Sequence, residues 1–435
     1  MILNIKLCNV AGIKSKVELN FLASKNDKKN MSSIYINKDN LWINRIAGII
    51  AGNAHGKTTI LDALSSVGSF IQLPLRKKNV PSLSDIDIDM EEYKDEYKEK
   101  IFQKMVSNFI SLELPESNKL NNNENSKIEV EMYIKTSDEV TDGYYKYILE
   151  YNDRYKSDGI KLESLFFKNK YSKSYNNIFE IHDSFESEIG YKIAYEKNYI
   201  NELKSINIST VDFEKKIKYY KTFLKHYNKE SSIIYANNYV FPEFYIINKL
   251  NECDNMNSLL QIAKLADNNI KEIYIMKNEK NDPKLMFKYD GFCLHYSKIS
   301  TATQKLVAMA YSILNSNKYN GILLIDELDN SLNIEISKFI IELFSKKENS
   351  LSQLIFTTNN PEILDYLRRD QIFLILKQKY ELNVINFYNF IDPVTNRRVR
   401  NDYSFIKAYK KNVIENFPNE ELKEQINYNF LEKDK

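Results

Sequence analysis

Glycine and proline are scarce in this chain, with 10 glycines and 8 prolines among 435 residues. Cysteine is scarcer still, and the three cysteines, Cys8, Cys253 and Cys293, have neither the spacing of a metal site nor that of a disulfide framework. This usage is typical of a reducing compartment, so we expect a cytoplasmic protein. Because glycine is rare, its clustering is informative: three of the ten glycines lie between residues 48 and 56.

Long apolar runs and an excess of either charge are also missing. No run approaches the ~20 apolar residues that a membrane-spanning helix needs, and Met1 leads directly into a strand-like segment instead of a targeting signal. We therefore expect no membrane partner. The 61 Lys and Arg against 59 Asp and Glu give a net charge of +2, which excludes bulk attraction to nucleic acid. Binding of nucleic acid through a local patch, such as Arg397-Arg398, stays open.

What the chain does contain is a large apolar fraction, 43%, which excludes a disordered chain and supports a sizeable core. Alternating apolar residues in 2–7 and 17–21 predict two strands around a turn at Ala11-Gly12. Residues 42–50 end in an apolar run typical of a buried strand, and residues 59–72 have helical apolar spacing. The glycine cluster therefore lies between a predicted strand and a predicted helix.

The turn between that strand and that helix has the residues of a phosphate-binding loop. Gly56 lets the chain approach a phosphate closely, Lys57 supplies a point charge for the β- and γ-phosphates, and Thr58 offers a hydroxyl to Mg²⁺. The helix that follows would direct its positive N-terminal end at the phosphates. We therefore predict a site for ATP and Mg²⁺ in which Lys57 is also catalytic. The residues of the nucleotide site are Gly52, Asn53, Ala54, His55, Gly56, Lys57, Thr58 and Thr59.

Two acidic residues end a second apolar run. Residues 321–326 predict a buried strand, and Asp326 at its tip can hold the Mg²⁺ shell. Glu327, one residue further, can orient and deprotonate an attacking water. The alternative is a buried strand that ends in surface acids, an alternative that the phosphate-binding loop makes weaker.

A third motif opens a predicted helix at residues 298–315. It consists of Ser300, Thr301, Ala302, Thr303 and Gln304. A serine at the start of a helix is most often an N-cap, and that interpretation stands beside the functional one.

Two further segments follow these three motifs: Leu-Asp-x-Ser at 328–331 and an Ile-Phe-Thr-Thr strand at 355–358. In this order, the five features resemble the ABC-type ATPase heads of the SMC and RecF group. They are most similar to the bacterial "AAA family ATPase" proteins of that group, which are linked to abortive infection and anti-phage defence. The resemblance implies an α/β P-loop NTPase fold. It also implies that Ser300 to Gln304 contact the γ-phosphate bound by a second subunit, with ATP held between two heads of a dimer or higher oligomer.

The same resemblance assigns Asp329 and Ser331 to a loop that crosses the dimer interface, and Asn359 to the place of the switch histidine. Three residues depart from the family pattern. Ala51 and Ala302 replace glycines, and Asn359 cannot accept a proton at neutral pH as a histidine can. Each departure weakens hydrolysis more than binding, so we expect a slow ATPase.

The motifs divide the chain into a discontinuous head and an insertion. We predict an ATPase head of residues 1–75 and 290–395, an inserted lobe of residues 76–289, and a C-terminal helical segment of residues 396–435. The lobe is expected to hold antiparallel strands in 127–170 and helices in 84–110, 196–228 and 256–267; further helices and strands are expected at 333–346, 352–358 and 371–390.

The function that the resemblance implies is an ATP-driven conformational switch that dimerises and serves an anti-phage defence system. No second catalytic set is visible in the sequence, so we expect a separate effector protein, a nuclease or a toxin. Two alternatives stay open: a RecF-like DNA repair ATPase, and a scaffold that binds ATP without hydrolysis and cages a toxin or nuclease.

Overall fold

The computed structural model describes most of the chain. The described residues are 1–51 (apart from 12, 15, 28 and 38), 56–78, 124–152, 160–182, 210–227, 233–236, 243, 246–247, 256–277, 283–346, 351–378, 381–392, 396–398 and 405–410.

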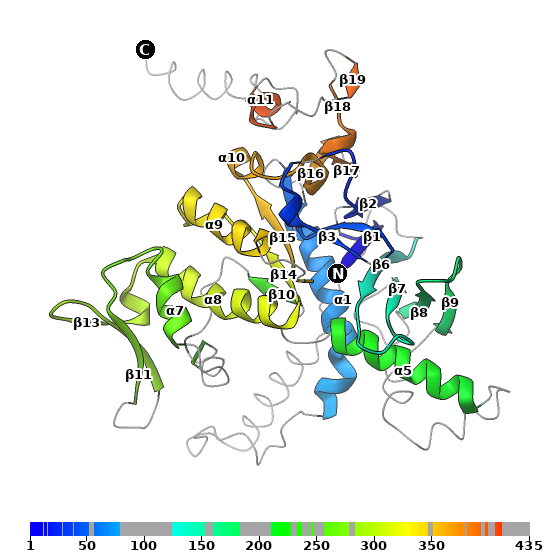
Figure 1. Cartoon of the computed structure of the whole chain (residues 1–435), viewed down its shortest axis with the longest axis horizontal. Helices are drawn as coiled ribbons and strands as arrows, with labels where there is room; N and C mark the ends of the chain where they lie inside the picture. Colours follow the sequence, from blue (N-terminus) through cyan, green and yellow to red (C-terminus); the bar gives the residue numbers. More distant parts are fainter. Residues whose placement is uncertain are drawn as a thin grey trace, which may run out of the picture.

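A mostly parallel sheet forms the centre of the fold (Figure 1). Its strands, in spatial order, are β10 (Ile233–Ala236), β14 (Ile322–Ile325), β15 (Gln353–Thr358), β5 (Ile46–Ala51), β16 (Ile372–Gln378) and β17 (Glu381–Asn386). The first five strands are parallel, and β17 is antiparallel to β16. All residues of β5, β14 and β15 are buried, as expected for parallel strands covered on both faces.

A second sheet is entirely antiparallel. Its strands, in spatial order, are β2 (Val17–Asn20), β1 (Ile2–Cys8), β6 (Ser126–Ile134), β7 (Gly143–Tyr151), β8 (Ile160–Asn169) and β9 (Asn176–His182). Residues of β6 alternate between buried and half-buried positions along most of the strand. This period of two gives the sheet one face that packs on the core.

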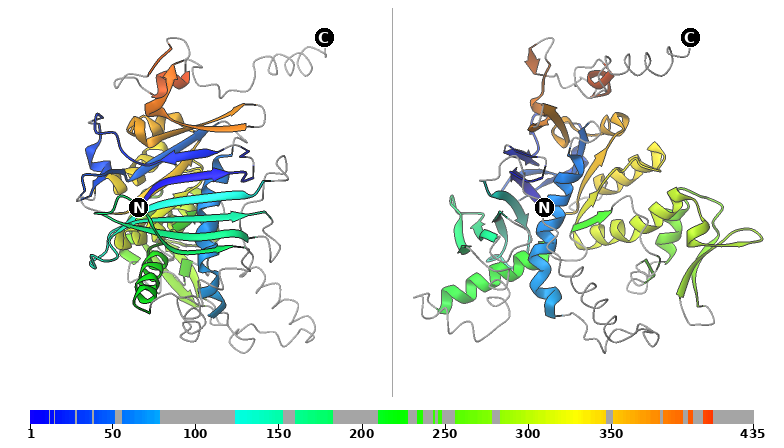
Figure 2. Two further views of the ribbon diagram at one scale, coloured as in Figure 1. Left: turned by 90° about the vertical axis from the view of Figure 1, so that its right-hand side faces the viewer. Right: turned by 180° about the vertical axis from the view of Figure 1, so that it is seen from behind.

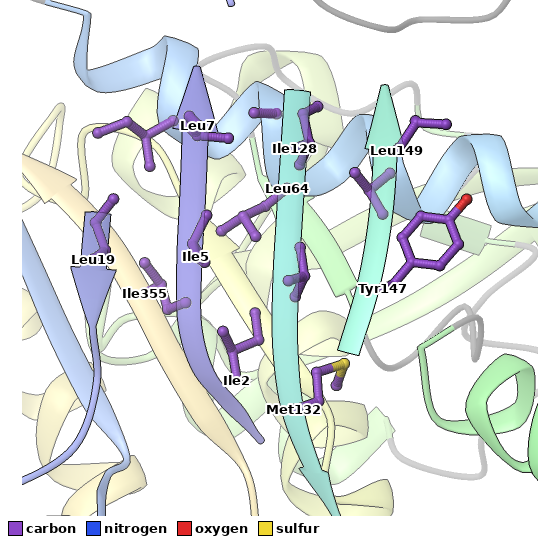
Figure 3. Close-up of a cluster of buried hydrophobic side chains, with 14 of the residues drawn as sticks. Ile2, Ile5, Leu7, Leu19, Leu64, Ile128, Met132, Tyr147, Leu149 and Ile355 are labelled. Atoms are coloured by element: carbon purple, nitrogen blue, oxygen red, sulfur yellow. The ribbon is translucent and has the colours of Figure 1, made fainter. Parts of the chain in front are cut away.

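Helix α1 (Lys57–Lys78) lies between the two sheets, as the two views in Figure 2 show. Its buried residues, among them Leu61 and Leu64, belong to one core with the antiparallel sheet and the near face of the central sheet. Figure 3 shows Leu64 among side chains of β1 and β6, with Ile355 of β15 nearby. Helix α5 (Thr210–Tyr227) adds Tyr220, Phe223 and Tyr227 to the same core.

The far face of the central sheet is covered by helices from the last third of the chain. A second core joins this face to residues of α8 (Thr301–Tyr319), α9 (Ile334–Ser345), α10 (Pro361–Leu364) and α11 (Phe405–Lys410). Helix α8 also packs on α7 (Met256–Ala263) and on a three-stranded sheet of β11 (Glu272–Lys277), β12 (Pro283–Lys288) and β13 (Cys293–His295), which project to one side (Figure 1). Two short hairpins, β3 (Ile34–Ile36) with β4 (Trp42–Asn44) and β18 (Ile391–Asp392) with β19 (Arg397–Arg398), complete the strands.

The sequence-based elements agree with these bounds in most of the described chain. The buried strand expected at the end of residues 42–50 is present as β5; the start of that segment is a separate strand, β4, which belongs to a different sheet. The helix expected in 84–110 lies outside the described residues, as do residues 196–209 of the helix expected in 196–228. Of the expected C-terminal helical segment, the structure describes α11 and β19.

The predicted division into a head and an inserted lobe stays a prediction about domain boundaries. Strand pairing crosses the expected boundaries in three places: β6 pairs with β1, β10 pairs with β14, and β12 pairs with β13. The α/β P-loop fold class itself is confirmed. Across the described ranges, none of the helices combines the length and apolar character that crossing a bilayer requires.

Candidate nucleotide-binding site

The phosphate-binding loop joins the end of β5 to the start of α1. Ala51 ends the strand and Lys57 begins the helix. Gly56 has a left-handed backbone with φ of 79°, and a Cβ added there would lie 2.6 Å from the side chain of Leu382. A residue with a side chain would therefore be strained at this position. Gly52, Asn53, Ala54 and His55 lie outside the described residues, so their assignment to the site stays a prediction.

The ammonium of Lys57 lies near the carboxyl ends of β5 and β15. Its ammonium donates to the carbonyl of Ala51 over 3.0 Å and to Oδ1 of Asn359. Burial lowers the pKa of Lys57, while the nearby carboxylates of Glu327, Asp329 and Asp326 act to raise it. The lysine is thus a desolvated cation, held where the resemblance places the β- and γ-phosphates.

The buried carboxylate of Asp326 follows β14 and lies between two hydroxyls. Oδ2 accepts from Oγ1 of Thr58 over 3.0 Å, and Oδ1 accepts from Oγ1 of Thr357 over 2.5 Å. Mg²⁺ takes oxygen ligands and is often held through one or two carboxylates. The Thr58 hydroxyl and the Asp326 carboxylate fit that preference, so these two residues would hold Mg²⁺. Thr59, also predicted for the site, is half-buried in the first turn of α1.

Glu327 begins a tight turn immediately after Asp326. Its φ is 48°, a left-handed value that is uncommon outside glycine and often marks functional sites. Its N–H donates to Oγ1 of Thr357 over 2.7 Å. Its carboxylate accepts from Nδ2 of Asn330 over 3.2 Å and from Nδ2 of Asn359 over 3.5 Å. Two asparagines therefore hold the side chain that was predicted to be the base.

The loop residues assigned by resemblance also reach this network. Oδ1 of Asp329 accepts from the N–H of Asn359 over 3.2 Å. Ser331 is exposed, with φ of 61°. Lys57, Thr58, Asp326, Glu327, Asp329 and Asn359 thus share one hydrogen-bonded network.

The segment from Ser300 to Gln304 forms the start of α8 and lies outside this network. Oγ of Ser300 accepts from the N–H of Thr303 over 3.2 Å, so Ser300 caps the helix. Thr303 is buried, and the amide of Gln304 donates to the carbonyls of Tyr296 and Ile299. Ser300 and Thr301 are exposed, and Ala302 is half-buried.

Sequence reasoning assigned no site role to three residues that contact the network, Thr357, Asn330 and Lys305, although each lies in or beside one of the motifs. Thr357 was detectable in part, because a hydroxyl at the carboxyl end of a buried strand can face the ends of its neighbours. Lys305 donates from α8 to two carbonyls of the Glu327 turn, over 2.9 and 2.8 Å. No local pattern signals such a contact between residues 22 positions apart.

Comparison with known proteins places this geometry in a family. Residues 46–365 match the family model described as "AAA domain, putative AbiEii toxin, Type IV TA system". An uncharacterized protein of Dictyostelium discoideum is 26% identical over 172 residues, which cover 38% of this chain. The chain spans only 21% of that relative.

Solved SMC head domains are also similar to this chain. One, bound to the C-terminal winged-helix domain of ScpA, is 14% identical with a TM-score of 0.45; 88% of this chain and 97% of that chain are covered. The head from Thermotoga maritima is 12% identical with a TM-score of 0.38 and coverage of 88% and 98%. A head with an extended coiled coil, bound to the C-terminal domain of ScpA derived from Pyrococcus furiosus, is 12% identical, with a TM-score of 0.42 and coverage of 94% and 98%.

The family match includes the phosphate-binding loop, α8, the Asp326-Glu327 pair and Asn359, and it extends over well more than half of the chain. The chain therefore belongs to the AAA-domain family of putative AbiEii toxins of type IV toxin–antitoxin systems.

Proposed function

We propose that this chain is a cytoplasmic ATPase that binds ATP with Mg²⁺, hydrolyses it slowly, and uses ATP binding to join two heads. The observation that carries the proposal is the convergence of Lys57, Thr58, Asp326 and Glu327 at the carboxyl ends of β5 and β14. Ligands of open parallel sheets bind at this edge. Transfer of a phosphoryl group to water needs a cation on the phosphates, a metal ion and a group that orients the water. Lys57, the pair of Thr58 and Asp326, and Glu327 can supply these three functions at this edge.

Each residue has a separate task. Lys57 offers a desolvated charge that can replace its bonds to Ala51 and Asn359 with bonds to phosphate oxygens. Thr58 and Asp326 present oxygens to the metal. When bound, Mg²⁺ neutralises charge that develops on the phosphates. Glu327 accepts the proton of the attacking water on its carboxylate.

The proposed slow rate follows from Asn359. Its Nδ2 donates to the Glu327 carboxylate, and its Oδ1 accepts from Lys57. An amide can orient both groups but cannot take a proton at neutral pH. Asn359 therefore supports the arrangement of the site without supplying the chemistry of the histidine that the resemblance expects.

The proposed switch acts between two copies of the chain. Ser300 and Thr301 are exposed at the start of α8, and Ser331 is exposed beside the network. The resemblance directs Ser300 and Thr301 toward the ATP of a second head and assigns Ser331 to the loop that crosses the dimer interface. The family description names a putative toxin of a toxin–antitoxin system, and the role in anti-phage defence is the part of this proposal that comes from the resemblance of the motifs. We propose that the dimer controls a separate nuclease or toxin.

The test compares wild type with Glu327→Gln and with Glu335→Gln, which changes an exposed carboxylate of α9. We expect wild-type turnover well below the ~10 s⁻¹ that is the median for enzymes. Glu327→Gln should lower it by about 10²–10⁴-fold, the usual contribution of a general base. Binding of a fluorescent ATP analogue should be unchanged in both variants. With ATP, Glu327→Gln should double in mass by light scattering, and an added Ser300→Arg should prevent the doubling.

The outcomes separate the alternatives. Fast turnover, or turnover that Glu327→Gln leaves intact, would contradict the assignment of the base. ATP binding without turnover in wild type would favour the ATP-bound scaffold that cages an effector. Monomers under every condition, together with strong stimulation by DNA, would favour a RecF-like repair ATPase.

A further inference from the structure

A half-buried lysine on α8, Lys305, binds the turn that carries Glu327. The Nζ of Lys305 donates to the carbonyl of Glu327 over 2.9 Å and to the carbonyl of Asn330 over 2.8 Å. The N–H of Asn330 donates back to the carbonyl of Glu327 over 2.9 Å, which closes the turn. One ammonium therefore binds the first and the last carbonyl of the same four-residue turn.

That turn needs an external constraint. Glu327 has φ of 48° and Ser331 has φ of 61°, and side-chain-bearing residues adopt such values at an energetic cost. The N–H of Leu328 donates to the carbonyl of Thr357, which ties the turn to β15 on its other side. Strained backbone of this kind persists where the surroundings fix it. Here Lys305 constrains the turn from one side and β15 constrains it from the other.

The charge of Lys305 is unusual for a packing residue. Lysines commonly extend their ammonium to water, whereas burial lowers the pKa of Lys305 to about 8. The carboxylates of Asp329, Glu327 and Asp326 face it and favour the charged form. Partial desolvation of an ammonium carries an energetic cost, and here the ammonium makes charge-assisted hydrogen bonds to two backbone carbonyls.

We infer that Lys305 is a positioning residue for Glu327: by fixing the turn of residues 327–330, it holds the carboxylate in the orientation that hydrolysis requires. Asn330 shares the task, because Lys305 binds its carbonyl while its side chain donates to Glu327 over 3.2 Å. Lys305 lies five residues after Ser300, so it also ties the exposed start of α8 to this turn. The inference rests on the proposed hydrolysis by Glu327.

The experiment uses the full chain with Lys305→Met, whose unbranched side chain ends where the ammonium begins and cannot donate, and Lys305→Arg, which keeps the charge. Lys346→Met, at an exposed lysine that pairs with Glu342 at the end of α9, is the matched control. We measure kcat, KM and thermal unfolding for each, and kcat from pH 6.5 to 9.5. Lys305→Met should lower kcat by at least ~10-fold, in line with the ~10²-fold cost of a 1 Å misplacement, with KM unchanged.

The pH profile separates positioning from a merely structural role. In wild type, kcat should fall as the pH rises through about 8, where Lys305 loses its proton. An arginine stays charged throughout this range. Lys305→Arg should therefore recover part of kcat and move this alkaline fall to higher pH. Wild-type kcat in Lys305→Met, an equal loss in Lys346→Met, or superimposable profiles for wild type and Lys305→Arg would overturn the inference.

Hydrogen exchange of the free protein tests the inference independently of hydrolysis. In Lys305→Met, the amides of Leu328 and Asn330 should exchange faster than in wild type, while those of β14 should not change. If wild type shows no turnover that depends on Glu327, the proposed function fails, and this result still decides whether Lys305 holds the turn. Unchanged exchange at both amides would reject that role.

Discussion

Two lysines, the buried Lys57 and the half-buried Lys305, place their ammonium groups near the same three carboxylates, Asp326, Glu327 and Asp329. Burial lowers the pKa of both lysines, and the carboxylates oppose that effect. Lys57 bonds to one carbonyl and one side-chain amide, whereas Lys305 bonds to two carbonyls of a closed turn. At the residue scale, this difference separates a cation that can transfer its bonds to phosphate from one that supports the backbone.

Glu163 provides a pH-dependent prediction at the same scale. Its carboxyl is buried and accepts from the hydroxyl of Tyr147 over 2.9 Å. Burial raises the pKa of Glu163 from 4.5 to about 7. Below pH 4.5 the group is protonated in both states and its burial carries no ionisation penalty. As the pH rises from 4.5 to 7, the unfolded state releases the proton first, so stability falls.

The penalty above pH 7 should be roughly 3 kcal/mol, since one pKa unit corresponds to about 1.4 kcal/mol. We expect Glu163→Gln to remove this part of the pH dependence, so that the variant gains on wild type between pH 5 and pH 8.5. Urea unfolding at both pH values measures it. A constant difference in free energy of unfolding between the two proteins would show that Glu163 does not carry the shift.

How much of the site could be predicted depends on the kind of information that each residue carries. Lys57, Thr58, Asp326 and Glu327 are detectable from the sequence because each is a charged or hydroxyl residue next to the end of a predicted strand or at the start of a predicted helix. Asn330 and Lys305 act through backbone carbonyls and a left-handed turn, which residue type does not reveal. Thr357 contacts Asp326 because β15 lies beside β14, and the sequence does not state that adjacency.

At the scale of elements, periodicity predicted the strands and helices but not which strands share a sheet. The alternation in β6, β7 and β8 indicated antiparallel strands, and these strands are present. That they continue the sheet begun by β1 depends on pairing between residues more than 100 positions apart. The break between β4 and β5 also depends on contacts that are distant in the sequence. The guanidinium of Arg45 donates to the carbonyls of Ser32 and Ser345, and these bonds fix the corner between the two strands.

One fully buried arginine ties a loop to the end of the central sheet. Arg368 precedes β16, and its guanidinium binds both oxygens of Asp370 at 3.0 and 2.8 Å. It also donates to three carbonyls, those of Ser24, Asp27 and Lys29, over 2.6–2.9 Å. Removing one partner of a buried charged pair leaves the other uncompensated.

We therefore expect Arg368→Met to lower the free energy of unfolding by about 3–5 kcal/mol. Arg397→Met, at an exposed arginine of β19, should change it by no more than ~0.5 kcal/mol. Chemical denaturation of both variants measures the difference. Equal, small effects would mean that the loop of residues 24–29 does not depend on this arginine.

At the scale of the whole molecule, the two large sheets are joined by α1 and by one buried glutamine. Gln353 begins β15, and its Oε1 accepts from the N–H of Ile2 over 2.8 Å. Its Nε2 donates to the carbonyls of Ile2 and Asn44 over 3.1 and 2.9 Å. The opposite end of the same strand carries Thr357, which binds Asp326. One strand therefore connects the antiparallel sheet with the candidate site, which lies about 13 Å further along at ~3.3 Å per residue.

Because Gln353 lies at the opposite end of β15 from the candidate site, its substitution should change the stability of the fold without changing the binding of ATP. Gln353→Leu leaves three buried backbone groups without partners, each worth about 1–3 kcal/mol, so we expect a loss of at least ~3 kcal/mol. Gln353→Glu keeps an acceptor for Ile2 but places a carboxylate against two carbonyls, and should be less stable than Gln353→Leu. The rise in melting temperature on adding an ATP analogue should match wild type in both variants, because the site itself is untouched. Loss of that rise at full folding would mean instead that the joint between the sheets is part of the switch.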